Sequence, residues 1–82
     1  MPIAPDFAVE LRSANDSLRA MQQKMREYMN CGVRLAWLID PQNRQVEIYR
    51  LGQEVEVLKA PTSLSGEDVL PGFVLDLTGI LN

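Results

Sequence analysis

An almost unbroken apolar run, Val33-Arg34-Leu35-Ala36-Trp37-Leu38-Ile39, is the feature that most constrains how this 82-residue chain can fold. A run of this length, rich in branched and aromatic side chains, is typical of a β-strand that is buried on both faces. An edge strand or a surface strand would leave one of those faces in water. We therefore predict that residues 33–39 form a central strand.

The residues before this run predict a first strand and the start of a helix. The strand covers residues 5–12, and the polar residues after it begin the helix. Ser13, with Asp16 three residues later, resembles a capping box that has Asp in place of Glu, although Asn15 could be the cap instead.

The helix is expected to run from about Asp16 to Asn30. One face of this segment is apolar at helical spacing and is assigned to the core, and Gly32 supplies a left-handed stop. The apolar face consists of Leu18, Met21, Met25, Tyr28 and Met29.

Two further strands are expected after the central run, at residues 45–50 and 54–59. Turn residues at 40–44 and 51–53 separate them, so that three successive strands form an antiparallel meander. Residues 45–50 alternate as a half-buried strand does. In the last strand the valines are expected to face inward and the glutamates outward, namely Val55, Val57, Glu54 and Glu56. The tail, residues 61–82, is expected to hold loops, a short strand near 73–75 and one helical turn after Asp76.

This order of elements predicts an α/β fold that borders on α+β. A strand-helix-strand unit precedes the meander, and its two strands are expected to lie parallel in one mixed sheet of four or five strands, joined by a right-handed crossover. The one main helix packs on a face of that sheet. With 82 residues the chain is expected to be a single small domain, residues 1–82.

Composition narrows the classes of function. The net charge of −3 and the pI near 4.7 count against a nonspecific nucleic-acid binder, so a DNA role would need a local basic patch. A single cysteine, Cys31, and no histidine exclude an intramolecular disulfide and a structural zinc site, which suits a reducing cytoplasm. No apolar run is long enough to span a bilayer, and a soluble, cytoplasmic protein without membrane partners is expected.

An acid and a base lie two residues apart on the first strand. Because strand side chains alternate, Glu10 and Arg12 project to one side, while Phe7, Val9 and Leu11 project to the other. A carboxylate beside a fixed cation suits a metal-dependent nuclease, which needs an oxygen ligand and a positive charge for the phosphate. The alternative is a solvated charge pair on a half-exposed strand.

Three motifs in order resemble one known family. They are residues 2–13, which contain PDFAVELRS; residues 18–41, which contain KMREY and GVRLAWLIDP; and residues 64–73, LSGEDVLPGF. Together they resemble the Uma2 family of restriction endonuclease-like proteins, a branch of the PD-(D/E)XK nuclease superfamily. The resemblance covers essentially the whole chain.

The resemblance implies a Mg²⁺-dependent phosphodiesterase site and DNA as the partner. Glu10 would be the metal-ligand carboxylate, and the backbone carbonyl of Leu11 would complete the coordination. Arg12 stands where the superfamily usually has its catalytic lysine; it can clamp a phosphate but is a poor proton carrier. Lys24 on the following helix is the other candidate for the cation, its alternative being a surface lysine.

The resemblance also predicts what the chain lacks. In this family a metal-binding Asp lies on a strand upstream of Glu10, and Asp6 cannot replace it, because four strand residues place the two roughly 13 Å apart. We therefore expect the C-terminal part of a restriction-endonuclease-like domain, truncated and weakly active or inactive alone, and leave open whether it is an enzyme. The alternative is a non-catalytic dimerisation or interaction module, with a second copy or a partner chain covering the exposed sheet and helix face.

Overall fold

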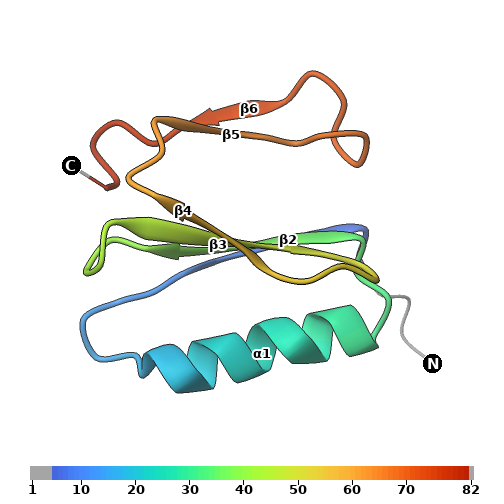
Figure 1. The fold of residues 1–82 in the computed structure, drawn as a ribbon, viewed down its shortest axis with the longest axis horizontal. Helices are drawn as coiled ribbons and strands as arrows, with labels where there is room; N and C mark the ends of the chain where they lie inside the picture. Colours follow the sequence, from blue (N-terminus) through green and yellow to red (C-terminus); the bar gives the residue numbers. More distant parts are fainter. Residues whose placement is uncertain (1–4, 82) are drawn as a thin grey trace.

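The computed structural model describes residues 5–81 and arranges them in three layers (Figure 1). A four-stranded sheet lies in the middle, the helix covers one of its faces, and a two-stranded hairpin lies over the other. The elements in chain order are β1 (Phe7–Leu11), α1 (Leu18–Asn30), β2 (Leu35–Asp40), β3 (Gln45–Arg50), β4 (Glu56–Lys59), β5 (Ser63–Ser65) and β6 (Val74–Asp76). Residues 2–4 of the first sequence motif and Asn82 of the tail lie outside the described residues.

The main sheet has the predicted mixed topology. Its strand order is β1-β2-β3-β4, with β1 parallel to β2 and the two remaining pairs antiparallel. The α/β prediction, the parallel first pair and the meander are all confirmed. A parallel pair cannot be joined by a tight turn, so the chain between β1 and β2 must cross the sheet, and α1 is that crossover.

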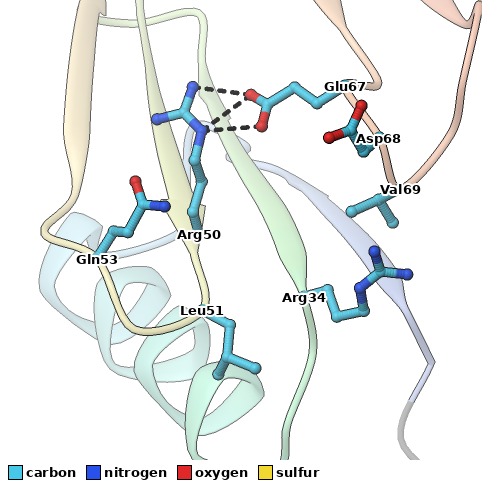
Figure 2. A pocket seen from close by; sticks show the side chains of 7 residues that line it. All are labelled: Arg34, Arg50, Leu51, Gln53, Glu67, Asp68 and Val69. Carbon is cyan, nitrogen blue, oxygen red and sulfur yellow. Dashed lines mark hydrogen bonds and ion pairs between the residues drawn. The ribbon is translucent and has the colours of Figure 1, made fainter.

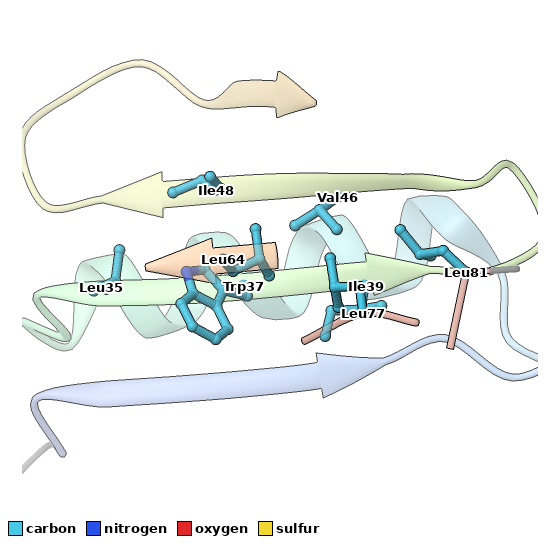
Figure 3. Close-up of a cluster of buried hydrophobic side chains, with 8 residues drawn as sticks. All are labelled: Leu35, Trp37, Ile39, Val46, Ile48, Leu64, Leu77 and Leu81. Atoms are coloured by element: carbon cyan, nitrogen blue, oxygen red, sulfur yellow. The ribbon is translucent and has the colours of Figure 1, made fainter. Parts of the chain in front are cut away.

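Strand β2 is central and buried along its whole length, as predicted. Alternate side chains enter two separate cores. Leu35, Trp37 and Ile39 face the β5–β6 hairpin (Figure 3), and Ala36 and Leu38 face α1. The hairpin and the turn after it contribute buried leucines to the first core, so both faces of the strand are covered within this chain.

Helix α1 buries the predicted apolar stripe, but it begins later than expected. Met25 is fully buried, and the other four residues of the stripe pack around it against the sheet. The expected under-covered helix face is therefore covered by the chain's own sheet. Neither Ser13 nor Asn15 caps the helix. Ser17 does, by accepting a hydrogen bond from the Ala20 amide.

Asp16 and Ser13 do interact as a capping box would suggest, but in the turn before the helix. The Asp16 carboxylate accepts hydrogen bonds from the Ser13 amide and hydroxyl, each at 2.9 Å. This contact closes the turn that leads from β1 into α1. The predicted contact between Ser13 and Asp16 is thus present, but it does not cap the helix. The cap is Ser17, four residues after Ser13.

The helix ends as predicted at Gly32, whose φ is +92°. The Gly32 amide donates to the Met29 carbonyl, and the Val33 amide donates to the Tyr28 carbonyl, which is the hydrogen-bond pattern of a Schellman motif. Val33 is fully buried and brings the chain directly into β2. The stop therefore also sets the point at which the central strand begins.

Strands β3 and β4 correct two expectations. Strand β3 was predicted to be half-buried, yet its four central residues are all buried, because α1 covers one face and the hairpin the other. Strand β4 begins at Glu56 rather than residue 54, and the predicted inward-facing Val55 and Val57 are exposed.

The reason for the second error lies in the edge position of β4. In the register of β3 and β4, the neighbours of Val46 and Ile48 are Leu58 and Glu56, so it is Leu58 that packs on the core. Val57 is opposite Glu47 and faces the helix side of the sheet. Helix α1 packs on β2 and β3 there, so Val57 on the edge strand stays exposed.

The tail forms the β5–β6 hairpin. Strand β6 lies one residue after the predicted 73–75, and β5 lies in a segment that was predicted to be a loop. After Asp76 the chain makes a hydrogen-bonded turn rather than a helix, in which the Ile80 and Leu81 amides both donate to the Leu77 carbonyl. That turn buries Leu77 and Leu81 in the core shared with Trp37. In residues 5–81 no helix is long and apolar enough to cross a membrane.

The Gly32 helix stop generates a stability prediction. A Cβ added at Gly32 would meet nothing within 4 Å, so Gly32→Ala tests backbone strain alone. The left-handed conformation costs a residue with a Cβ about 1 kcal/mol, and we expect that loss of unfolding free energy in urea titrations. Asn30→Ala, at the exposed last residue of α1, is the control and should change stability by less than about 0.5 kcal/mol. Equal stability of Gly32→Ala and the wild type would contradict the strained helix stop.

Candidate functional site

Glu10 lies on β1 beneath α1, where both of its carboxylate oxygens are engaged by the helix. The parallel register pairs Glu10 with Leu38 of β2, which faces α1. The Lys24 ammonium lies 3.0 Å from Oε1, and the Tyr28 hydroxyl donates to Oε2 at 2.6 Å. Lys24 and Tyr28 are four residues apart, so they lie one turn apart on the same side of the helix.

These contacts favour the charged form of the pair. Burial alone would raise the pKa of Glu10, but hydrogen bonds from Tyr28 and Lys24 outweigh it and hold that pKa below its ordinary value. The hydrogen bond to Glu10 raises the pKa of Lys24 in turn. The Glu10 side chain is 20% exposed and that of Lys24 51%, so the ion pair is open to solvent and to a ligand.

Arg12 lies beyond the end of β1, beside Asp40 at the end of β2. Its Nη1 donates to both Asp40 carboxylate oxygens, at 3.1 and 3.2 Å, and its Nε donates to the Asp16 carbonyl at 3.1 Å. The guanidinium therefore ties together the ends of two strands and the entry to α1. All described hydrogen bonds of the Arg12 guanidinium go to Asp16 and Asp40. The structure therefore pairs Glu10 with Lys24, and Arg12 with Asp40.

Asp40 was considered only as a turn residue, yet its side chain is fully buried. Besides Arg12 it accepts hydrogen bonds from the Gln42 amide, the Asn43 amide and the Asn43 side chain. Burial would raise the pKa of Asp40, but the hydrogen bonds from Asn43 and Arg12 hold it below its ordinary value. The β2–β3 turn is thus organised around one carboxylate.

The remaining candidates lie at the outer edge of the sheet. Leu11 ends β1 opposite Ile39 and is 58% exposed. Asp6 is exposed, and its backbone carbonyl accepts hydrogen bonds from the Arg34 and Leu35 amides at the start of β2. Among the described residues its carboxylate has no hydrogen-bond partner, and the structure does not bring it together with the Glu10 pair.

Sequence reasoning missed a second polar contact under the same helix. Glu47 of β3 is only 4% exposed and accepts hydrogen bonds from Tyr49 at 2.6 Å and from Gln22 at 2.8 Å. Glu10, Leu38 and Glu47 are register partners, so the two glutamates lie in one row across the sheet. The helix sequence did contain a signal for this contact. Gln22 and Lys24 lie on opposite sides of the apolar stripe, so each of them borders the sheet on its own side of the helix.

Another ion-pair cluster joins the hairpin to the main sheet. Arg50 of β3 pairs with Glu67 at 2.8 Å and with Glu56 of β4 at 3.0 Å. Figure 2 shows Arg50 and Glu67 of this cluster at a surface hollow that Arg34 and Asp68 also line. The hollow has a volume of about 270 Å³. Because Arg50 is already neutralised by two carboxylates, the hollow offers little net positive charge for an anion.

The third sequence motif, residues 64–73, encodes the turn that aims Glu67 at Arg50. A Cβ on Gly66 would lie 2.5 Å from the Leu70 carbonyl oxygen, so only glycine fits there. The Gly66 amide donates to the Phe73 carbonyl, and the Leu70 amide donates to the Gly66 carbonyl. The motif therefore serves packing and chain reversal rather than the Glu10 pair.

Comparison with known proteins identifies the family. A family model named Uma2, described as a putative restriction endonuclease, matches residues 1–78. The chain belongs to the Uma2 family. No curated protein matches the chain.

A solved structure resembles this Uma2 chain throughout its length. It is described as the crystal structure of a putative nuclease belonging to DUF820 from Anabaena variabilis, and it is 27% identical with a TM-score of 0.81. The match covers 98% of the present chain and 45% of that chain, so the present chain spans less than half of that protein's length. The fold is accordingly that of the restriction endonuclease-like nucleases.

Nucleases of the Uma2 type are generally metal-dependent, but residues 5–81 do not by themselves fit a divalent-cation site. They contain no group of three or more His, Cys, Asp or Glu side chains that could hold a metal ion. The oxygens of Glu10 are held by Lys24 and Tyr28, and those of Asp40 by Arg12 and Asn43. The chemistry of the described residues is therefore that of an acid and a cation held side by side.

The buried Asp40 contact generates a prediction about acid stability. The pKa of Asp40 in the folded protein lies below its ordinary value of 3.8, so its charge stabilises the fold above about pH 4 and this contribution is lost as the pH falls through the folded-state pKa. We expect Asp40→Asn to cost about 2 kcal/mol of unfolding free energy at pH 7 and markedly less at pH 3, measured by urea unfolding. Asp68→Asn, at an exposed carboxylate, is the control. A deficit for Asp40→Asn that is the same at both pH values would contradict the role of the charge.

Proposed function

We propose that this chain is the C-terminal part of a Uma2-type endonuclease domain that hydrolyses phosphodiester bonds in DNA. The observation that carries the proposal is the 3.0 Å contact between Glu10 of β1 and Lys24 of α1. It joins a carboxylate to a half-exposed ammonium on the nuclease fold. That combination is what phosphoryl transfer requires of a protein, which mainly positions groups and stabilises negative charge.

In this proposal the two cations have different roles. Lys24 provides the positive charge that meets the phosphate, because its ammonium is exposed and adjacent to Glu10. Arg12, whose side chain is only 14% exposed and bound to Asp40, holds β1 and β2 in place and orients the segment that carries Glu10. Lys24, and not Arg12, thus takes the role of the catalytic cation, although Arg12 occupies the motif position where the superfamily usually has its lysine.

We propose Mg²⁺ as the cofactor, with Glu10 and the Leu11 carbonyl as the ligands that this chain contributes. Mg²⁺ prefers a near-octahedral set of oxygen ligands, and these two alone are a poor cage. The affinity of this chain for the ion should therefore be low.

A plasmid-nicking assay tests the proposed site. With Mg²⁺ or Mn²⁺ and a high protein concentration, the wild type should nick supercoiled DNA slowly, and Glu10→Ala should reduce the rate about 100-fold, because the group that faces the phosphate together with Lys24 is lost. Glu27→Ala, at an exposed acid on the same helix, is the control and should nick like the wild type. Equal residual activity in Glu10→Ala and the wild type would remove Glu10 from the mechanism.

A second candidate function is a non-catalytic interaction module. The outer strand β1 favours it, since it ends the sheet and presents Val9 and Leu11, which are 47% and 58% exposed. Open strand edges with apolar side chains readily pair with another chain. The partner in this case would be a second copy or a fuller nuclease chain.

Sedimentation at micromolar concentration separates the module from the isolated enzyme. If the module is the function, the wild type should sediment as a dimer or larger species, and Leu11→Glu should shift it to a monomer, because a charge on the outer strand opposes pairing. Lys59→Glu on β4 is the control for charge alone. A wild-type protein that is monomeric and fully folded would argue strongly against this function.

A further inference from the structure

The Tyr28 hydroxyl is unusual among the groups of the helix stripe, because it serves no packing purpose. The ring of Tyr28 packs against the core that contains Met25 and Leu38, as the other stripe residues do. A phenylalanine would provide that contact equally well. The hydroxyl instead reaches past the core to the sheet edge and donates to Glu10 Oε2 at 2.6 Å.

A second tyrosine–glutamate hydrogen bond lies under the same helix and can be compared with that of Tyr28 and Glu10. Tyr49 donates to Glu47 at the same distance, 2.6 Å, and Glu47 lies in the same row of the sheet as Glu10. Glu47 is nearly fully buried, its other partner is the neutral Gln22, and no described ion pair includes it. Glu10 is partly open to solvent and is bound to an ammonium. Both tyrosines satisfy a carboxylate under the helix, but only Tyr28 acts on one that a substrate can reach.

We propose that Tyr28 is a positioning residue of the Glu10 site. Its hydroxyl fixes Oε2, so the carboxylate cannot rotate and Oε1 stays directed at Lys24. Because Tyr28 and Lys24 are one helical turn apart, the same segment of α1 sets both contacts. This inference rests on the proposed nuclease function, since positioning matters only if Glu10 and Lys24 act together on a phosphate.

The test compares Tyr28→Phe with Tyr49→Phe, which removes an equivalent hydroxyl from the buried Glu47. Each variant is measured in four ways: the ¹³Cδ chemical shift of the Glu10 carboxylate, the ¹⁵N–¹H signal of the Lys24 ammonium, the plasmid-nicking rate and the affinity for DNA. Thermal midpoints are recorded alongside as a check on folding.

We expect Tyr28→Phe to move the Glu10 and Lys24 signals and to lower the nicking rate at least about tenfold, with unchanged DNA affinity, because groups that orient a reactive side chain typically contribute 10- to 100-fold. Tyr49→Phe should leave the Glu10 and Lys24 signals and the nicking rate unchanged. Rate loss without a matching fall in thermal midpoint separates positioning from a structural role.

The outcomes distinguish this inference from the proposed function. If the Glu10 and Lys24 signals do not move in Tyr28→Phe, or if they move while the nicking rate stays at the wild-type value, Tyr28 is not a positioning residue. Nicking that Glu10→Ala leaves unchanged, or a wild type that does not nick at all, overturns the proposed function and the inference with it. Equal rate losses in the two tyrosine variants would overturn the inference alone, because they would indicate a general effect on α1.

Discussion

The parallel pairing of β1 with β2 is the constraint on which the rest of this structure depends. Parallel neighbours must be joined by a crossover, and α1 occupies that crossover on one face of the sheet. The register then places Glu10 beside Leu38, beneath the helix, and leaves Arg12 next to Asp40 at the strand ends. A register shifted by one residue would turn Glu10 to the opposite face, away from Lys24. The candidate site is thus a direct consequence of how two strands are paired.

Three carboxylates are held by three different solutions to the same physical problem. A buried or half-buried charge must be hydrogen-bonded, because its desolvation is otherwise costly. Asp40 is surrounded by an arginine and turn amides, Glu47 by two neutral donors, and Glu10 by a tyrosine and a lysine. Of the three, Glu10 combines partial exposure with an exposed ammonium, which makes it the one suited to a ligand. Asp40 and Glu47 hold together the elements around it.

Periodicity and residue type predicted the strands of the main sheet, the helix face and the parallel pair, because those features depend on local pattern and on the handedness of crossovers. The extent of β3 burial could not be predicted in the same way. Glu47 alternates with apolar neighbours as a surface residue would, and only the helix placed over it makes it an interior group. The predicted inward orientation of Val55 and Val57 was wrong for the converse reason: β4 is an edge strand, and α1 does not cover it. Lys24 was a candidate cation from the family resemblance, and its contact with Glu10, like that of Arg12 with Asp40, became visible only in the structure.

The most direct test of the account is a double-mutant cycle on DNA nicking with Glu10→Gln and Lys24→Met. If the two side chains act as one unit on the phosphate, either change should remove most of the rate, and the double variant should be no slower than the worse single variant. If the two effects instead multiply in the double variant, Glu10 and Lys24 contribute independently, and the 3.0 Å contact between β1 and α1 is a structural ion pair rather than the centre of the site.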